Sequence, residues 1–270
     1  MEHQTEYPVR EEGVKASNKI MYKGIITGLL ILVMMIPAFF INNLVQERKQ
    51  RQREIVEEVS SKWGSGQTIS GFYLSVPYDQ ADKDEKGNPI LIKRELIIFP
   101  ESQDVSSELI PEIRPRSIYK VLLYRSKINF KGQYKIVLPK DIDPTLINWA
   151  NASVCLGLTD IKGIEEKVVF NFNGQDLELS PGLPSSSLCK TGLFAGVNLE
   201  PFVGGTAFGF NSDLMIRGSE KLHFLPLAGN SRFAIQSVWN SPSFDGNYLP
   251  GTRVVNDSGF KGGWSFNKAN

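Results

Sequence analysis

The feature that most constrains this chain is one uncharged apolar stretch near its amino terminus. No charged residue lies between Lys23 and Glu47, and 11 of the 18 residues at 24–41 are Ile, Leu, Val or Phe. As a helix, residues 24–45 would be about 33 Å long, which matches a hydrocarbon core of about 30 Å. The stretch therefore predicts a transmembrane helix, which we place at residues 21–45.

Two other interpretations of this stretch compete. A cleaved signal peptide has a shorter apolar region of about 7–15 residues and a small-residue cleavage site after it. Here the polar residues Asn42 and Asn43 and then a charged run follow instead. A buried core helix would need other helices around it, and the remaining sequence does not predict them. We interpret the stretch as a retained membrane anchor.

The flanking charges orient this anchor only weakly. Basic residues precede it at Arg10, Lys15, Lys19 and Lys23, and follow it at Arg48, Lys49, Arg51, Arg53 and Lys62. The positive-inside count is therefore nearly neutral, but long domains are translocated largely regardless of flanking charge. We expect residues 1–20 to be a disordered cytoplasmic tail and the bulk of the chain to be periplasmic, beyond a bacterial inner membrane.

A charged helical stalk is predicted at residues 46–64. Glu47 with Arg51, and Arg53 with Glu57, are spaced at i,i+4, and Gly64 is a typical helix terminator. The charge run at 47–54 could instead bind lipid headgroups or nucleic acid, but its mixed signs favour a solvated stalk. The formal net charge of +1 also predicts no nucleic-acid partner.

Residues 65–270 follow an alternating pattern interrupted by Gly, Pro and Asn, which is typical of short strands. A single helix is expected after the N-cap Asp143, with Leu146 and Trp149 on one side. The fold class predicted is mainly β: an antiparallel β-sandwich-like periplasmic domain preceded by one transmembrane helix that continues into the stalk. Strands are expected at 69–77, 90–99, 118–125, 127–130, 133–138, 153–158, 167–172, 177–179, 193–199, 207–210, 213–217, 221–225, 232–239 and 259–266. The segments 118–125 and 127–130 could form one long strand or two strands joined by a bend.

Residues that could support catalysis are few. The two histidines are His3 in the tail and His223 in a predicted strand, so a Ser-His-Asp triad has little support. Asp82, Asp84 and Glu85 lack calcium-loop spacing and fit a solvated turn. We predict no metal, no cofactor and no catalytic residue, while a hydrolase that uses a pair of carboxylates stays open as an alternative.

The two cysteines, Cys155 and Cys189, lack the C-x-x-C spacing of redox and zinc sites. A disulfide between them is possible in an oxidising compartment, and the alternative is two separate thiols.

One aromatic segment is a candidate recognition loop. It consists of Trp239, Asn240, Ser241, Pro242, Ser243 and Phe244. The alternative, which we favour, is that the rings of Trp239 and Phe244 are buried to hold a turn between strands. We interpret Trp149 and Trp264 in the same structural way.

Several blocks in order resemble the CreD (Cet) family of bacterial inner-membrane proteins. They are INNLVQER (41–48), ISGFYLSVP (69–77), FPES (99–102), IYKVLLYRS (118–126), GLTDIKGI (157–164), RGS (217–219), FLP (224–226), WNSPSF (239–244) and GNYLP (246–250). No single block is specific, but their shared order covers nearly the whole chain.

The resemblance implies one transmembrane helix, a periplasmic β domain and then further transmembrane helices. Because the sequence ends at Asn270 and contains no second apolar run, we expect either the amino-terminal part of a longer protein or a short form. The family is associated with envelope integrity, stress response and tolerance to colicins, and it supplies no catalytic residue to carry over. The partners implied are the lipid bilayer, other envelope proteins or carboxyl-terminal transmembrane helices.

These observations together predict a membrane-anchored envelope protein with a non-catalytic β domain. Two alternatives remain: an envelope hydrolase, which would need a deep acidic cleft, and a module that binds lipid or another apolar ligand between its sheets.

Overall fold

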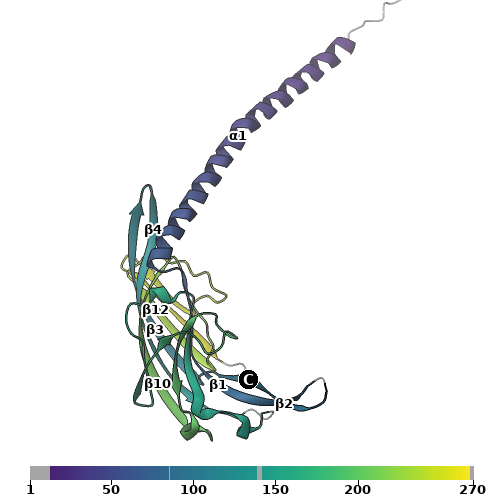
Figure 1. The fold of residues 1–270 in the computed structure, drawn as a ribbon. Coiled ribbons are helices and arrows are strands. Elements are labelled where there is room, and N and C mark those ends of the chain that lie inside the picture. Colours follow the sequence, from purple (N-terminus) through teal and green to yellow (C-terminus); the bar gives the residue numbers. More distant parts are fainter. Residues whose placement is uncertain (1–12, 85, 139–141, 268–270) are drawn as a thin grey trace, which may run out of the picture. The chain divides into compact units, whose positions relative to one another are not determined.

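The computed structural model describes residues 13–84, 86–138 and 142–267. It contains one long helix, α1 (Gly13–Trp63), followed by a strand-rich remainder (Figure 1). Tertiary contacts divide the chain into two compact units, with the boundary between Glu54 and Ile55. The last turns of α1 therefore belong to the same unit as the strands.

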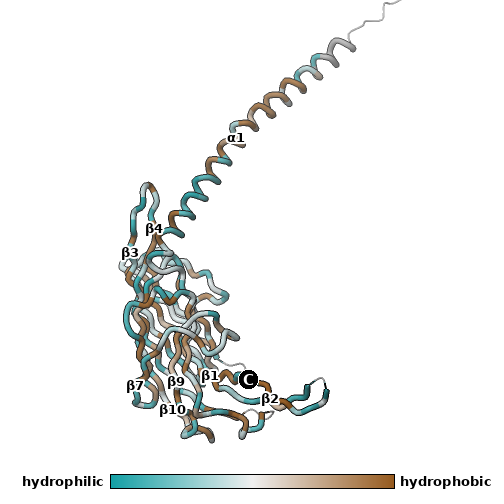
Figure 2. Tube along the Cα trace, in the orientation of Figure 1, coloured by the Kyte–Doolittle hydropathy of each residue, from teal (hydrophilic) through white to brown (hydrophobic). Residues whose placement is uncertain are grey.

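The apolar part of α1 is the predicted membrane helix. In the described residues, α1 is the one helix long and apolar enough to cross a membrane, and Figure 2 shows the hydrophobic middle of this helix. The apolar side chains of this part are exposed. The helix already includes residues 13–20, within the tail that the sequence analysis expected to be disordered. Extending an existing helix costs little, since only the first turn is expensive. Residues 1–12 of that tail lie outside the described part.

The remainder is mainly β, as the sequence predicted, and forms two sheets. The first has the order β11-β1-β5-β9-β8 with β2 paired to β1, and the second has the order β13-β14-β12-β3-β4-β10-β6-β7. Neighbouring strands are antiparallel except for the parallel pairs β1–β11 and β3–β12. The strands are β1 (Gln67–Lys83), β2 (Pro89–Ile98), β3 (Ser102–Arg116), β4 (Tyr119–Lys135), β5 (Ala152–Leu158), β6 (Val169–Phe172), β7 (Gln175–Glu178), β8 (Ser180–Pro181), β9 (Gly192–Val197), β10 (Ala207–Ser219), β11 (Leu222–Phe224), β12 (Asn230–Ser237), β13 (Thr252–Asn256) and β14 (Gly259–Asn267).

Phenylalanine rings join the two sheets in a common core. Phe72 of the first sheet is fully buried and contacts three rings of the second, with centroid distances of 5.2 Å to Phe130, 4.7 Å to Phe170 and 6.0 Å to Phe210. Each well-placed aromatic pair adds about 0.5–1.5 kcal/mol beyond the burial of its area. The 16 Phe in the sequence are thus used largely to fill the space between sheets.

Strand β3 was missed by sequence reasoning. Its inward-facing residues include the polar Gln103 and Ser107, so the alternating apolar pattern is weak, and Pro111 and Pro115 argue against a strand. The pairing explains the prolines: β3 pairs with β12 only as far as Leu109, so beyond it one edge is unpaired and can accommodate proline. The short edge strand β13 was also missed.

Two other expectations change in detail. The helix expected after Asp143 is instead a pair of short 3-10 turns, Pro144–Leu146 and Trp149–Asn151. Asp143 does cap the first of them, because its carboxylate accepts a hydrogen bond from the Thr145 backbone N–H at 2.9 Å. The segments expected at 118–125, 127–130 and 133–138 are mostly one strand, β4, which continues through Lys131 and Gly132.

The end of α1 is fixed to the strands by what we call the helix socket, formed by Trp63 with Val121, Leu123 and Arg114. Trp63 is 9% exposed and packs on the fully buried Val121 and Leu123 of β4. The Arg114 guanidinium lies 4.2 Å from the centre of the Trp63 ring. A cation over an indole is worth about 0.5–2 kcal/mol, depending on how far it is desolvated.

The chain leaves the socket through Gly64 and Asp160. Gly64 has φ +150, and a Cβ there would lie 2.8 Å from the Arg217 carbonyl oxygen, so this exit requires glycine. The Asp160 carboxylate then accepts hydrogen bonds from Ser65 and from the Lys162 N–H. Partial burial raises the pKa of Asp160, but these hydrogen bonds outweigh it and the net pKa is lowered.

Replacing Trp63 should show how much the socket contributes to stability. Trp63→Ala leaves a cavity over Val121 and Leu123 and is expected to lower the free energy of unfolding by about 3 kcal/mol. Trp63→Phe keeps most of the ring contact and should cost less than half as much. Denaturant unfolding of the full chain in detergent, followed by circular dichroism, measures both. Equal losses for the two variants would contradict the packing role.

Asp160 should make stability depend on pH. Because its folded pKa lies below the unfolded value of about 3.9, its contribution is complete above that value and is lost as pH falls through the folded pKa. Asp160→Asn removes this titration, so the variant should lose less stability than the wild type between neutral and acidic pH. The check is the shift of the denaturation midpoint with pH. The same shift in both proteins would rule out Asp160 as a contributor.

Candidate functional site

The predicted recognition loop lies in the connection between β12 and β13. Trp239 and Phe244 are half-buried, and the polar residues Asn240, Ser241 and Ser243 are exposed. The Trp239 indole N–H donates a hydrogen bond to the Ser241 carbonyl at 2.8 Å, which closes the turn. Phe244 contacts the rings of Phe260 and Trp264 at 5.7 and 5.8 Å. Both half-buried rings therefore help to hold the turn.

The same loop covers one side of a cavity of about 740 Å³, which we call the aromatic pocket. The rest of its wall comes from β3, β4, β11, β12 and β14. Its volume lies in the usual range for ligand sites, about 300–1,000 Å³. The aromatic side chains in the wall are Tyr124, Phe224, Phe233, Trp239, Phe244, Tyr248, Phe260, Trp264 and Phe266.

Three contacts hold the loop over the pocket. The Trp264 indole N–H donates to the Tyr248 carbonyl at 3.1 Å, and the Tyr248 and Phe266 rings meet edge to face at 5.1 Å. On the other side, Lys221 Nζ lies 3.8 Å from the Asp245 carboxylate. Because both partners of this ion pair are more than half exposed, it contributes little to stability. The ion pair is thus the weakest of the three attachments.

Polar groups of both signs also line the pocket. Lys221 and His223 are the basic residues of the lining, and Glu220 and Asp245 are the acidic ones. The Tyr124 hydroxyl donates to the Lys221 carbonyl at 2.7 Å, and burial raises the pKa of this phenol above its ordinary value of 10.0. Tyr124 therefore stays neutral. The pocket combines an apolar aromatic wall with a few charges, which suits an amphiphilic ligand.

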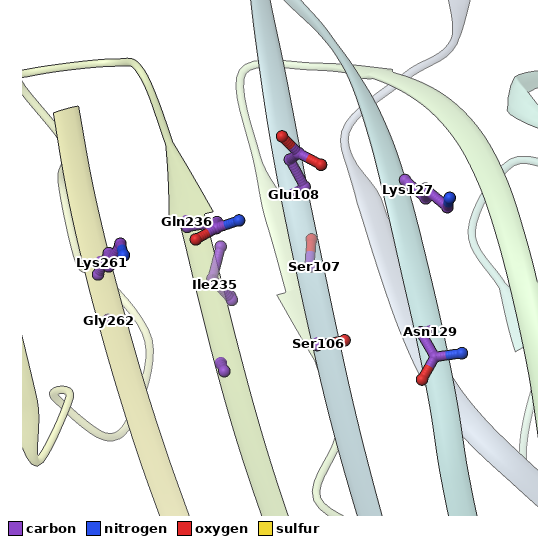
Figure 3. A pocket seen from close by; sticks show the side chains of 10 residues that line it. Ser106, Ser107, Glu108, Lys127, Asn129, Ile235, Gln236, Lys261 and Gly262 are labelled. Carbon is purple, nitrogen blue, oxygen red and sulfur yellow. The ribbon is translucent and has the colours of Figure 1, made fainter. Parts of the chain in front are cut away.

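A second cavity of about 410 Å³ is a shallow groove on the opposite face of the second sheet. The side chains of Lys261, Gln236, Glu108 and Lys127 extend from four neighbouring strands in one row (Figure 3). Glu108 is the one carboxylate in the lining and lies between cations and amides. A glycosidase pair needs two carboxylates about 5–9.5 Å apart. The groove therefore lacks such a pair, and the two acids of the aromatic pocket, Glu220 and Asp245, lie in a wall made mostly of aromatic and apolar side chains.

The two cysteines are unbonded thiols in the structure. Cys155 is a buried residue of β5 in the first sheet, and this burial raises the pKa of its thiol to about 12. Burial also raises the pKa of Cys189. A thiol with a raised pKa is a poor nucleophile and metal ligand. Among the described residues, no group of three His, Cys, Asp or Glu side chains could hold a metal ion.

Sequence reasoning found the loop but missed most of the pocket wall. Tyr124 lies in β4 and Phe233 in β12, two strands that are far apart in the sequence. The order of strands in the sheet brings them to the same pocket, and local periodicity does not predict that order. Trp264 was interpreted as a structural residue, and it also lines the pocket. The signal that could have predicted the pocket is the high density of aromatic residues in the last 50 residues of the sequence.

The helix and the two-sheet unit with its aromatic pocket define a class: a β-rich protein with a membrane helix. A sequence profile described as inner membrane protein CreD matches residues 19–270. The chain therefore belongs to the CreD family of inner membrane proteins, and the resemblance seen in the sequence is confirmed.

One relative illustrates the match. The chain is 25% identical over 241 residues to the inner membrane protein CreD of Escherichia coli (strain K12), an alignment that covers 87% of this chain and 52% of the relative. The chain thus spans about half the length of this relative.

The hydrogen bond from Trp264 to Tyr248 should limit the mobility of the loop. Trp264→Phe removes the bond and keeps an aromatic ring, so opening of the loop should become easier by about 1 kcal/mol. Amides around Tyr248 are then expected to exchange hydrogen about fivefold faster in deuterium-exchange mass spectrometry. Trp149→Phe is a matched control outside the pocket. Unchanged exchange in the Trp264 variant would contradict this attachment.

Proposed function

We propose that this chain is a membrane-anchored envelope protein whose β domain binds an amphiphilic ligand in the aromatic pocket and catalyses no reaction. The observation that carries the proposal is the wall of nine aromatic rings around a cavity of about 740 Å³. Apolar area removed from water contributes about 25 cal/mol per Å². The polar side chains of Lys221, His223 and Asp245 would hold a polar headgroup.

The absence of catalysis is part of the same proposal. The Glu108 groove has a single carboxylate, and the pocket acids Glu220 and Asp245 lie near the cation Lys221. We expect these carboxylates to pair with neighbouring cations. Acid and base catalysis usually requires two groups with separated pKa values.

The β domain is proposed to be periplasmic, with the amino terminus in the cytoplasm. The support is the bulk of the strand-rich segment, since the charges on the two sides of the anchor are nearly balanced. Partners proposed for the chain are the lipid bilayer, other envelope proteins and, as the family resemblance implies, carboxyl-terminal transmembrane helices. We also propose a role in envelope integrity, stress response and tolerance to colicins, on the family resemblance.

Protease added to intact spheroplasts tests the orientation. Residues 66–270 are expected to be cut without permeabilisation, while a tag at the amino terminus stays protected until the membrane is opened. Full protection of the β domain would overturn the proposed orientation.

Photoreactive fatty acid added to the full chain in lipid vesicles tests the ligand class. Labelled peptides are expected from residues 239–248 and 260–266 in addition to the membrane helix. Phe244→Arg places a charge in the pocket wall and should reduce labelling of these peptides at least about fivefold.

The matched control is Leu249→Arg, because Leu249 belongs to the same loop, is 71% exposed and does not line the pocket. It should leave the labelling unchanged. Labelling confined to the membrane helix, or equal losses in the two variants, would refute the pocket as the binding site.

A further inference from the structure

The tip of the β3–β4 hairpin is a second surface that the proposed function does not use. Strand β3 loses its partner β12 beyond Leu109, and β4 is paired with β10 only from Leu123 onward. Residues 110–122 therefore form a two-stranded hairpin that projects from the sheet (Figure 1). Its turn contains Ser117, with φ 56, and Ile118.

The hairpin follows the last turns of α1. Arg114 stacks on Trp63, and Arg116, two residues nearer to the tip, lies 3.4 Å from the Glu58 carboxylate. Strand β3 therefore runs alongside the end of α1 in the opposite direction, with Arg114 beside Trp63 and Arg116 beside Glu58. Arg116 therefore lies beside the segment 55–63, the part of α1 that belongs to the same unit as the strands.

Apolar and cationic side chains are combined at this tip. Ile118 is 73% exposed and Ile113 is 48% exposed, although no protein surface covers them in the described chain. The cations are Arg114, Arg116 and Lys120, and Glu112 is the one acid of the hairpin tip. Arg114 and Arg116 are paired with Glu112 and Glu58, while Lys120 has no ion pair among the described residues. The tip therefore offers positive charge around an exposed apolar side chain.

The connection between the membrane anchor and the β unit is short. About ten residues separate Val45, the end of the apolar stretch, from Ile55, and as a helix they span about 15 Å. The polar headgroup layer extends about 5–8 Å beyond the hydrocarbon core. A connection of this length permits the long cationic side chains of the hairpin to reach the headgroups.

We propose that the β3–β4 hairpin tip binds the anionic phospholipid headgroups of the leaflet on the β-domain side, with Ile118 at the interface and Arg116 and Lys120 against the phosphates. Cations next to an exposed aliphatic side chain are the combination that binds anionic lipid surfaces. This contact is independent of the aromatic pocket, since the hairpin tip contributes no residue beyond Pro111 and Leu122 to the pocket wall.

A photocrosslinking amino acid at position 118 tests the proposal in the full chain. The protein is reconstituted in vesicles of phosphatidylcholine alone or of equal parts phosphatidylcholine and phosphatidylglycerol. The matched control places the same amino acid at Leu91, which is 62% exposed in the other long hairpin, β1–β2. We expect lipid adducts at position 118 to rise about threefold or more when phosphatidylglycerol is present, and adducts at position 91 to stay low in both vesicles.

Lys120→Glu tests the charge without touching the helix socket. It should remove most of the preference for phosphatidylglycerol at position 118, and high salt should act in the same direction. Three results would overturn the proposal: equal lipid adducts at positions 118 and 91, adducts that do not respond to phosphatidylglycerol, or adducts to protein in place of lipid. A failure here leaves fatty-acid labelling of the aromatic pocket unaffected, so the two proposals are tested separately.

Discussion

The constraint on which the rest of the structure depends is the transfer of residues 24–45 out of water. Their side chains are exposed in the isolated chain, with Leu29 at 63% and Phe40 at 67%. Each central aliphatic or Phe residue contributes about −0.3 to −0.6 kcal/mol to insertion, so the helix is stable in a bilayer and costly in water. The unit that begins at Ile55 is therefore tethered to a lipid surface through α1.

The unit that begins at Ile55 is stabilised by a different interaction, the packing of aromatic rings between two sheets. Phe72 joins Phe130, Phe170 and Phe210 across the core, while Trp63 fixes the end of the helix on Val121 and Leu123. The aromatic pocket is the place where this filling is incomplete. There the aromatic side chains do not fill the space between the strands and the covering loop, and the cavity that remains can hold an apolar group.

The sequence was sufficient for features encoded locally and insufficient for features made by pairing at a distance. The uncharged run at 24–45 and the alternation around Phe72 predicted the membrane helix and the mainly β fold, and the blocks from residue 41 onward predicted the family. Strand β3 escaped because Gln103 and Ser107 face inward and Pro111 lies at an unpaired edge. The candidate loop was found from Trp239 to Phe244, but its partners Tyr124 and Phe233 depend on sheet order, which no local pattern specifies.

The central claim is that one helix holds the β domain at a membrane. Extraction of membranes with alkaline carbonate tests it most directly, because this treatment strips proteins held by charge or by surface contact and leaves those with a spanning helix. The account predicts that the full chain stays in the membrane pellet, and that a variant with Leu32→Arg and Ile36→Arg, which places two charges near the bilayer centre, is released. Release of the unaltered chain into the supernatant would contradict the account.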